Sequence, residues 1–333
     1  MCGMRKAAVF RPARILFYIL SLLVFYLAIR YIGTLKDIRL LLAQMSAAWL
    51  ILAVTAQVTT YLLNVMIFRT LLNGQTGTAG FITLFKLSIV ILFVNQALPS
   101  GGISGNGYLF RQLVKRKVPV AKAYQALVLE SITYYLAFIF LLTGLYAWVW
   151  HQPGHQPVMS YTVLIGCVFF CCLGALMLGI SNRRTISYLL PKLNRIRWLK
   201  RYIANSGLLT LSKSGNADWK DLFKDKKALI CAVFYHMSIL VCDAVTVFAI
   251  IHGFHVTLHP ALIMYGLLLS LVIGSLPISP GALIAYESAM TYFYTVLGLP
   301  VHAALIVTLL FRFFSFWLPI PIGLALYRNL RHR

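Results

Sequence analysis

The chain has 333 residues, of which 60% are hydrophobic and only 11% are charged, and its mean hydropathy is +0.83. This composition excludes a soluble globular domain and predicts an all-α polytopic membrane protein. The net charge of +23 does not predict binding to nucleic acid, because Lys and Arg gather in patches that alternate with apolar segments.

The chain contains six apolar segments that each approach the roughly 20 residues needed to cross a bilayer. They cover residues 15–32, 46–69, 123–148, 161–180, 228–251 and 301–327. No small-residue cleavage site follows the first segment, so we expect a retained span rather than a signal peptide. Two further apolar regions, 81–112 and 261–298, contain helix breakers and predict re-entrant hairpins or pairs of short spans.

The basic patches predict the orientation in the membrane. They lie before the first span, at 111–122, at 183–227 and after the last span, whereas 151–160 and 252–260 contain no Lys or Arg. The positive-inside rule therefore predicts a cytoplasmic (inner) membrane protein with both termini in the cytoplasm. Apolar residues interleave the 183–227 segment, which predicts amphipathic helices on the anionic membrane surface.

This arrangement predicts a single membrane domain, 1–333, built from an inverted-topology repeat. Residues 15–150 and 161–327 each contain two spans, a hairpin and a further span in the same order, but the two halves start on opposite sides of the membrane. In both halves a Leu-Pro pair (Leu98-Pro99 and Leu276-Pro277) precedes a final span that a proline introduces. The alternative is coincidence in a membrane sequence that contains many Pro and Gly residues.

Helix-breaking runs at 95–107 and 275–281 occupy matching places in the two halves, a pattern that predicts a binding site near the bilayer midplane. The helix starts that follow them would present backbone amides and a positive helix dipole to a phosphate. The candidate binding residues in these loops are Asn95, Pro99, Gly101, Gly102, Pro277, Ser279, Pro280 and Gly281.

Buried charges supply the other candidate binding residues. Glu130 and Arg312 lie about 12 and 18 Å along their predicted helices at equivalent positions of the two repeats, so we expect them to share a polar centre as an ion pair. Arg312, with Arg111, would attract an anionic headgroup while Glu130 orients the cation or is displaced. The alternative is a purely structural ion pair between packed helices.

Two more acidic residues lie in apolar segments. Glu287 follows Gly281 by six residues, which places it one to two turns into the next helix as a proton-binding or substrate-binding group. Compensation of the helix dipole is the alternative. Asp243 lies within a span and Thr246 follows one turn later, so we expect a structural hydrogen-bonding role for Asp243.

The chain lacks both the phosphate-binding loop of ATPases and a dinucleotide-binding glycine pattern, which disfavours an ATP-driven pump. No Ser/His/Asp set, metal-binding HExxH or acid pair stands out either. We therefore predict no catalytic residues, no metal and no cofactor.

Together these residues resemble the lysylphosphatidylglycerol synthase transmembrane family, the flippase-like domain found alone or fused to an aminoacyl transferase. The resemblance rests on the 95–102 and 276–281 loops, Arg111, Glu130, Glu287, and Arg312 with the following Phe316-Trp-Leu-Pro319. It implies movement of a lipid between leaflets. The chain ends at Arg333, so we do not expect lysyl transfer.

Two departures from the family pattern suggest a stiffer second loop and a different lipid. The family often has further glycines where this chain has Ala282 and Ile284, and an arginine where it has Ser131. Stand-alone members are associated with hopanoid or glycolipid pathways.

The predicted function is thus a lipid flippase or scramblase that moves an anionic or modified phospholipid, or a related polar lipid, without ATP hydrolysis. One alternative is a non-transporting accessory protein that binds a lipid-biosynthesis enzyme through the 183–227 segment. The other is an integral-membrane lipid transferase with Glu130 or Glu287 as its base.

Overall fold

The computed structural model describes residues 45–97, 103–151, 156–181, 223–276 and 284–331. The chain divides into two units, Met1–Ser46 and Ala47–Arg333, and the helices below all belong to the second unit. Several predicted features lie outside the described residues: the 15–32 span, nearly all of the 183–227 segment, and Pro99, Gly101, Gly102, Pro277, Ser279, Pro280 and Gly281.

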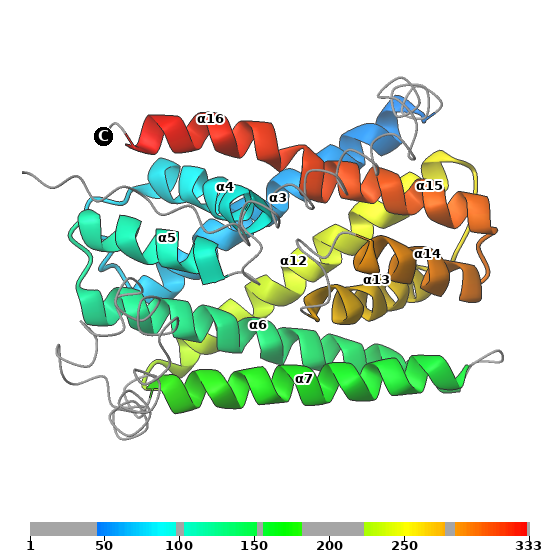
Figure 1. Cartoon of the computed structure of the whole chain (residues 1–333), viewed down its shortest axis with the longest axis horizontal. Coiled ribbons are helices and arrows are strands. Elements are labelled where there is room, and N and C mark those ends of the chain that lie inside the picture. The colour runs from blue at the N-terminus through cyan, green and yellow to red at the C-terminus, as the bar shows by residue number, and fades with distance from the viewer. Residues whose placement is uncertain (1–44, 98–102, 152–155, 182–222, 277–283, 332–333) are drawn as a thin grey trace, which may run out of the picture. The chain divides into compact units, whose positions relative to one another are not determined.

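Long apolar helices dominate the described residues, which contain no strand (Figure 1). By length and composition, five candidate spans within the described ranges are long enough to cross a membrane. They confirm five of the six predicted spans. Their helices are α3 (Ala47–Leu72), α6 (Val120–Val149), α7 (Pro157–Ser181), α12 (Lys226–Gly253) and the run α15 (Val301–Arg312), η2 (Phe313–Trp317) and α16 (Pro319–Arg331).

The two remaining apolar regions each fold as a pair of short helices. In the first pair α4 (Phe81–Ala97) packs against α5 (Ile103–Lys115), and in the second α13 (Pro260–Ser275) packs against α14 (Ala285–Val296). Each of these helices is shorter than the roughly 20 residues that a span requires. The predicted helical hairpins are therefore present, and a re-entrant path through the membrane remains a prediction.

Local sequence sets where several helices begin. Pro119 and Pro300 directly precede α6 and α15, and Pro260 is the first residue of α13. Proline suits these positions because the first amides of a helix have no partner within the helix. At the start of α12, the side chain of Asp225 accepts a hydrogen bond of 3.0 Å from the amide of Ala228.

The antiparallel pair α3 and α12 forms the centre of this unit (Figure 1). Their contacts run from Asn73 and Asp225 at one end to Trp49 and His252 at the other. Hydrophobic cores flank the pair. One lies among α3, α4, α5, α6 and the first half of α12, and the other among α6, α7, α12, α13 and α14. Large apolar side chains remain exposed on the spans, as expected of surfaces that face lipid.

Candidate functional site

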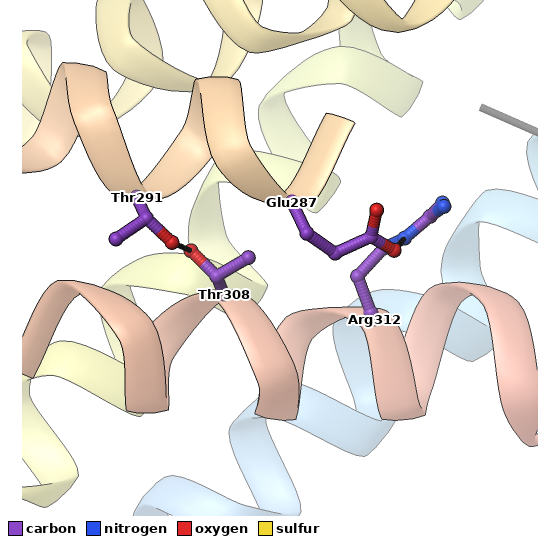
Figure 2. Close-up of polar contacts among 4 residues, drawn as sticks. All are labelled: Glu287, Thr291, Thr308 and Arg312. Carbon is purple, nitrogen blue, oxygen red and sulfur yellow. Dashed lines mark hydrogen bonds and ion pairs between the residues drawn. The ribbon is translucent and has the colours of Figure 1, made fainter. Parts of the chain in front are cut away.

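An ion pair between Glu287 and Arg312 lies where the second hairpin meets the last span (Figure 2). The Nε of Arg312, at the end of α15, donates to Oε1 of Glu287, in the first turn of α14, over 2.6 Å. The side chain of Arg312 is only 10% exposed and that of Glu287 only 19%. A hydrogen bond of 3.3 Å between Thr291 and Thr308 joins the same two helices further along. The hairpin is thus fixed to the last span by polar contacts.

Two aromatic rings also contact the guanidinium of Arg312. Its Cζ lies 4.6 Å from the ring centroid of Tyr286 and 4.4 Å from that of Phe316. Such cation–π contacts strengthen when the site is desolvated. Together with Glu287, the rings hold a permanent positive charge in an otherwise apolar helix.

Phe316 belongs to a wide helical turn, η2, that follows Arg312. In this turn the amide of Leu318 donates to the carbonyl of Phe313, five residues earlier, over 2.9 Å. Pro319 comes next, and a proline inside a regular helix would lose a hydrogen bond and clash with the preceding turn. The π-type turn accommodates this proline, and such turns frequently occur at functional sites.

The other oxygen of Glu287, Oε2, is buried and accepts no hydrogen bond from the described residues. Because a buried acceptor without a donor is costly, this oxygen is suited to receive a donor from a ligand. Glu287 also lies at the positive end of α14, directly after the interrupted loop. It is therefore closer to the start of its helix than the predicted one to two turns.

Glu130 does not fill the role predicted for it at Arg312, because the structure pairs Arg312 with Glu287 instead. Helix α14 packs directly on α15, whereas α6, which carries Glu130, packs mainly on α3, α5, α7, α12 and α13. Within its own helix, Glu130 accepts a hydrogen bond of 3.3 Å from the hydroxyl of Ser131. The similar depths of Glu130 and Arg312 along their helices were therefore not enough to predict a contact between them.

Asp243 accepts a hydrogen bond, and the structural role that we predicted for this bond remains a prediction. Nε2 of Gln57, on α3, donates to Oδ1 of Asp243 and to Oγ1 of Thr246, each over 3.0 Å. Sequence reasoning missed Gln57 as the partner. An amide side chain inside an apolar span was the available signal, because such a group needs a polar partner at membrane depth.

Asn95 closes the first hairpin. Its Oδ1 accepts a hydrogen bond of 2.8 Å from the amide of Gly105, in the first turn of α5. A Cβ at residue 105 would lie 2.4 Å from Oδ1 of Asn95, so any larger residue there would displace the Asn95 side chain. We predicted that the start of this helix presents free amides to a ligand. That prediction is wrong for Gly105, whose amide Asn95 occupies.

Arg111 is exposed on α5, where Leu109 and Leu113 bury the opposite face of the helix. Its contact with a headgroup remains a prediction. Within the described part of the chain, no three His, Cys, Asp or Glu side chains are grouped so that they could hold a metal ion.

Comparison with known proteins identifies one matching family and one relative. The family described as the lysylphosphatidylglycerol synthase TM region matches residues 14–323. A UPF0104 membrane protein of Methanocaldococcus jannaschii is 22% identical over 313 residues, covering 92% of this chain and 91% of that protein. No solved structure matches the chain. The ion pair and both hairpins lie inside the region that the family matches.

Proposed function

The chain belongs to the lysylphosphatidylglycerol synthase transmembrane family, and from this premise we propose that it moves a polar lipid with an anionic headgroup between the leaflets of the cytoplasmic membrane. Movement proceeds without ATP hydrolysis. Both termini face the cytoplasm in this proposal, and the acyl chains stay in the bilayer while the headgroup crosses through the protein.

The observation that carries the proposal is the buried Arg312 beside the second interrupted hairpin. Nε donates to Glu287, and the far end of the guanidinium is directed away from that carboxylate in Figure 2. Two oxygens of a phosphate can accept from a guanidinium side by side, as the two oxygens of a carboxylate do, so a phosphate competes for the same cation. A lipid phosphate would exchange with Glu287 at Arg312 and leave by the reverse exchange.

The helix packing supports the inverted repeat that alternating access requires. The predicted repeats pair α3 with α12, the first hairpin with the second, and α6 with the α15–α16 run. When each helix is replaced by its counterpart in the other repeat, the same pairs of elements are in contact. The packing of α16 on α4 corresponds to the packing of α6 on α13. The packing of α5 on α6 corresponds to the packing of α14 on α15. The antiparallel pair α3 and α12 would then lie across the pseudo-two-fold axis.

The first test is mass spectrometry of the lipids that the purified protein retains, compared between wild type and Arg312→Ala. Enrichment of an anionic lipid that is lost in Arg312→Ala supports the proposal. Arg69→Ala is the matched control because Arg69 also ends a span, α3, but is exposed. Equal enrichment in all three proteins would mean that Arg312 does not bind the headgroup.

The second test measures translocation in liposomes with a fluorescent phosphatidylglycerol whose outer-leaflet fraction is quenched chemically. Wild type should equilibrate the probe between leaflets, and Arg312→Ala should not. Loss of the probe to a chemically changed product would instead support the transferase alternative. No movement in wild type of any lipid that it retains would support the accessory-protein alternative.

A further inference from the structure

We propose that Asp243 is a proton-binding site inside the membrane, and that loading and unloading this site drives the lipid movement. The coupling rests on the proposed function, whereas the proton site stands on its own geometry. The juxtaposition that carries it is a carboxyl group that accepts from a neutral amide between α3 and α12, where the same amide also donates to Thr246.

Neutral groups surround Asp243. Its hydrogen-bond donor is Gln57, and no Lys or Arg among the described residues pairs with it. Tyr61 of α3, Tyr134 of α6 and Tyr286 of α14 carry neutral phenol groups within electrostatic range of Asp243. On its own helix the titratable neighbour is the thiol of Cys242. A carboxylate at membrane depth without a cation is costly, so a proton is the ligand that this environment favours.

Proton binding changes what Asp243 can do to its neighbours. An ionised carboxyl only accepts hydrogen bonds, whereas a protonated one also donates. Gln57 shares one amide nitrogen between Asp243 and Thr246, so its bonds respond to this change. These bonds join α3 to α12, so the protonation state of Asp243 affects the hydrogen bonds between the two proposed repeats.

Tyr286 lies close to both sites. Its ring contacts the guanidinium of Arg312, and its hydroxyl lies within electrostatic range of Asp243 and Glu287. The hydroxyl is buried and has no hydrogen-bond partner among the described residues. In the proposed coupling, a change of charge on Asp243 alters the competition between Glu287 and a phosphate for Arg312.

On the other side, titratable groups continue toward the start of α12, the predicted cytoplasmic end. The hydroxyl of Tyr134 experiences the charges of Asp243 and Glu130, and its ring lies 5.6 Å from that of His236. Nε2 of His236 is buried and unpaired among the described residues. Under the proposal, a proton would reach Asp243 from this side.

The proton site is tested without any lipid cargo by infrared difference spectroscopy of the purified full-length protein during acidification. Wild type should show the carbonyl band of a newly protonated, buried carboxyl group. Asp243→Asn should lose this band, whereas the control Asp225→Asn should keep it, because Asp225 caps the same helix at an exposed position. A band that persists unchanged in Asp243→Asn would overturn the proposal.

The coupling is tested in liposomes with fluorescent phosphatidylglycerol and an imposed pH gradient. If one proton crosses per lipid, a gradient of about one pH unit should shift the steady-state leaflet ratio about tenfold, and reversing the gradient should reverse the shift. Asp243→Asn should lose this gradient-dependent shift. Wild type that moves the lipid without responding to the gradient, or that responds to a sodium gradient instead, would overturn the coupling. Absence of any lipid movement would contradict the proposed function itself.

Discussion

Glu287 and Arg312, 25 residues apart in the sequence, join the first turn of α14 to the last residue of α15 through a hydrogen bond of 2.6 Å. This pair fixes the hairpin to the last span. In the proposed function the pair also binds cargo, because Arg312, whose charge Glu287 neutralises, is the cation that would bind the lipid phosphate. The structural and functional contributions must therefore be measured separately.

Removing one partner of this pair should destabilise the protein more than removing both. Arg312→Gln or Glu287→Gln alone leaves an uncompensated buried charge, at an expected cost of about 3–5 kcal/mol, and the double variant should recover most of this loss. Thermal unfolding in detergent measures the stability. Lipid translocation should stay abolished in the double variant, because no cation remains. Recovery of translocation together with stability would show that the pair has a structural role alone.

The first hairpin should depend on Asn95 as a hydrogen-bond acceptor. Asn95→Ala removes the acceptor for the amide of Gly105, and we expect a loss of about 0.5–2 kcal/mol, as for a helix cap. Asn95→Asp keeps an acceptor oxygen and should keep the stability at acidic pH, where its carboxyl group is neutral. Unfolding midpoints of the two variants at that pH decide this. Equal losses in both variants would mean that the amide NH₂ group, rather than the carbonyl oxygen, is what the protein uses.

Most of the fold was predictable because a bilayer demands apolar segments of a set length. The helix boundaries at Pro119, Pro260 and Pro300 follow from local chemistry in the same way. The partner of Arg312 was not predictable, because depth along a helix does not specify which neighbour faces it. Placing Glu287 there required the direct packing of α14 on α15. Gln57 was missed because its only sequence signal is its polarity within an apolar span.

Close packing of the second hairpin should make Gly274 intolerant of a side chain. A Cβ at Gly274 would lie 2.6 Å from Cδ2 of Tyr286, the residue that contacts Arg312. We expect Gly274→Ala to cost about 1–3 kcal/mol through overpacking and to reduce lipid translocation. Gly144→Ala is the control, because a Cβ there meets nothing within 4 Å and alanine favours the helix. Similar unfolding midpoints for the two variants would contradict the close packing.

Ile284, immediately before α14, holds a backbone conformation that disfavours its side chain. Its φ of 72° and ψ of −55° correspond to a γ-turn geometry that is rare and strained for a β-branched residue. The resemblance to the family identified this position as one where glycine is common. The side chain is 59% exposed, so replacing it removes little buried apolar surface.

Ile284→Gly should therefore stabilise the protein. Relief of about 1–3 kcal/mol of strain exceeds the roughly 1 kcal/mol that the added freedom of glycine costs in the unfolded chain. Leu297→Gly is the matched control, because Leu297 caps the other end of α14 at an ordinary φ of −80° and packs on the core. That variant should lower the unfolding midpoint, whereas Ile284→Gly should raise it. A lower midpoint in both would show that residue 284 is not strained, and that the conformation before Glu287 is as favourable for isoleucine as for glycine.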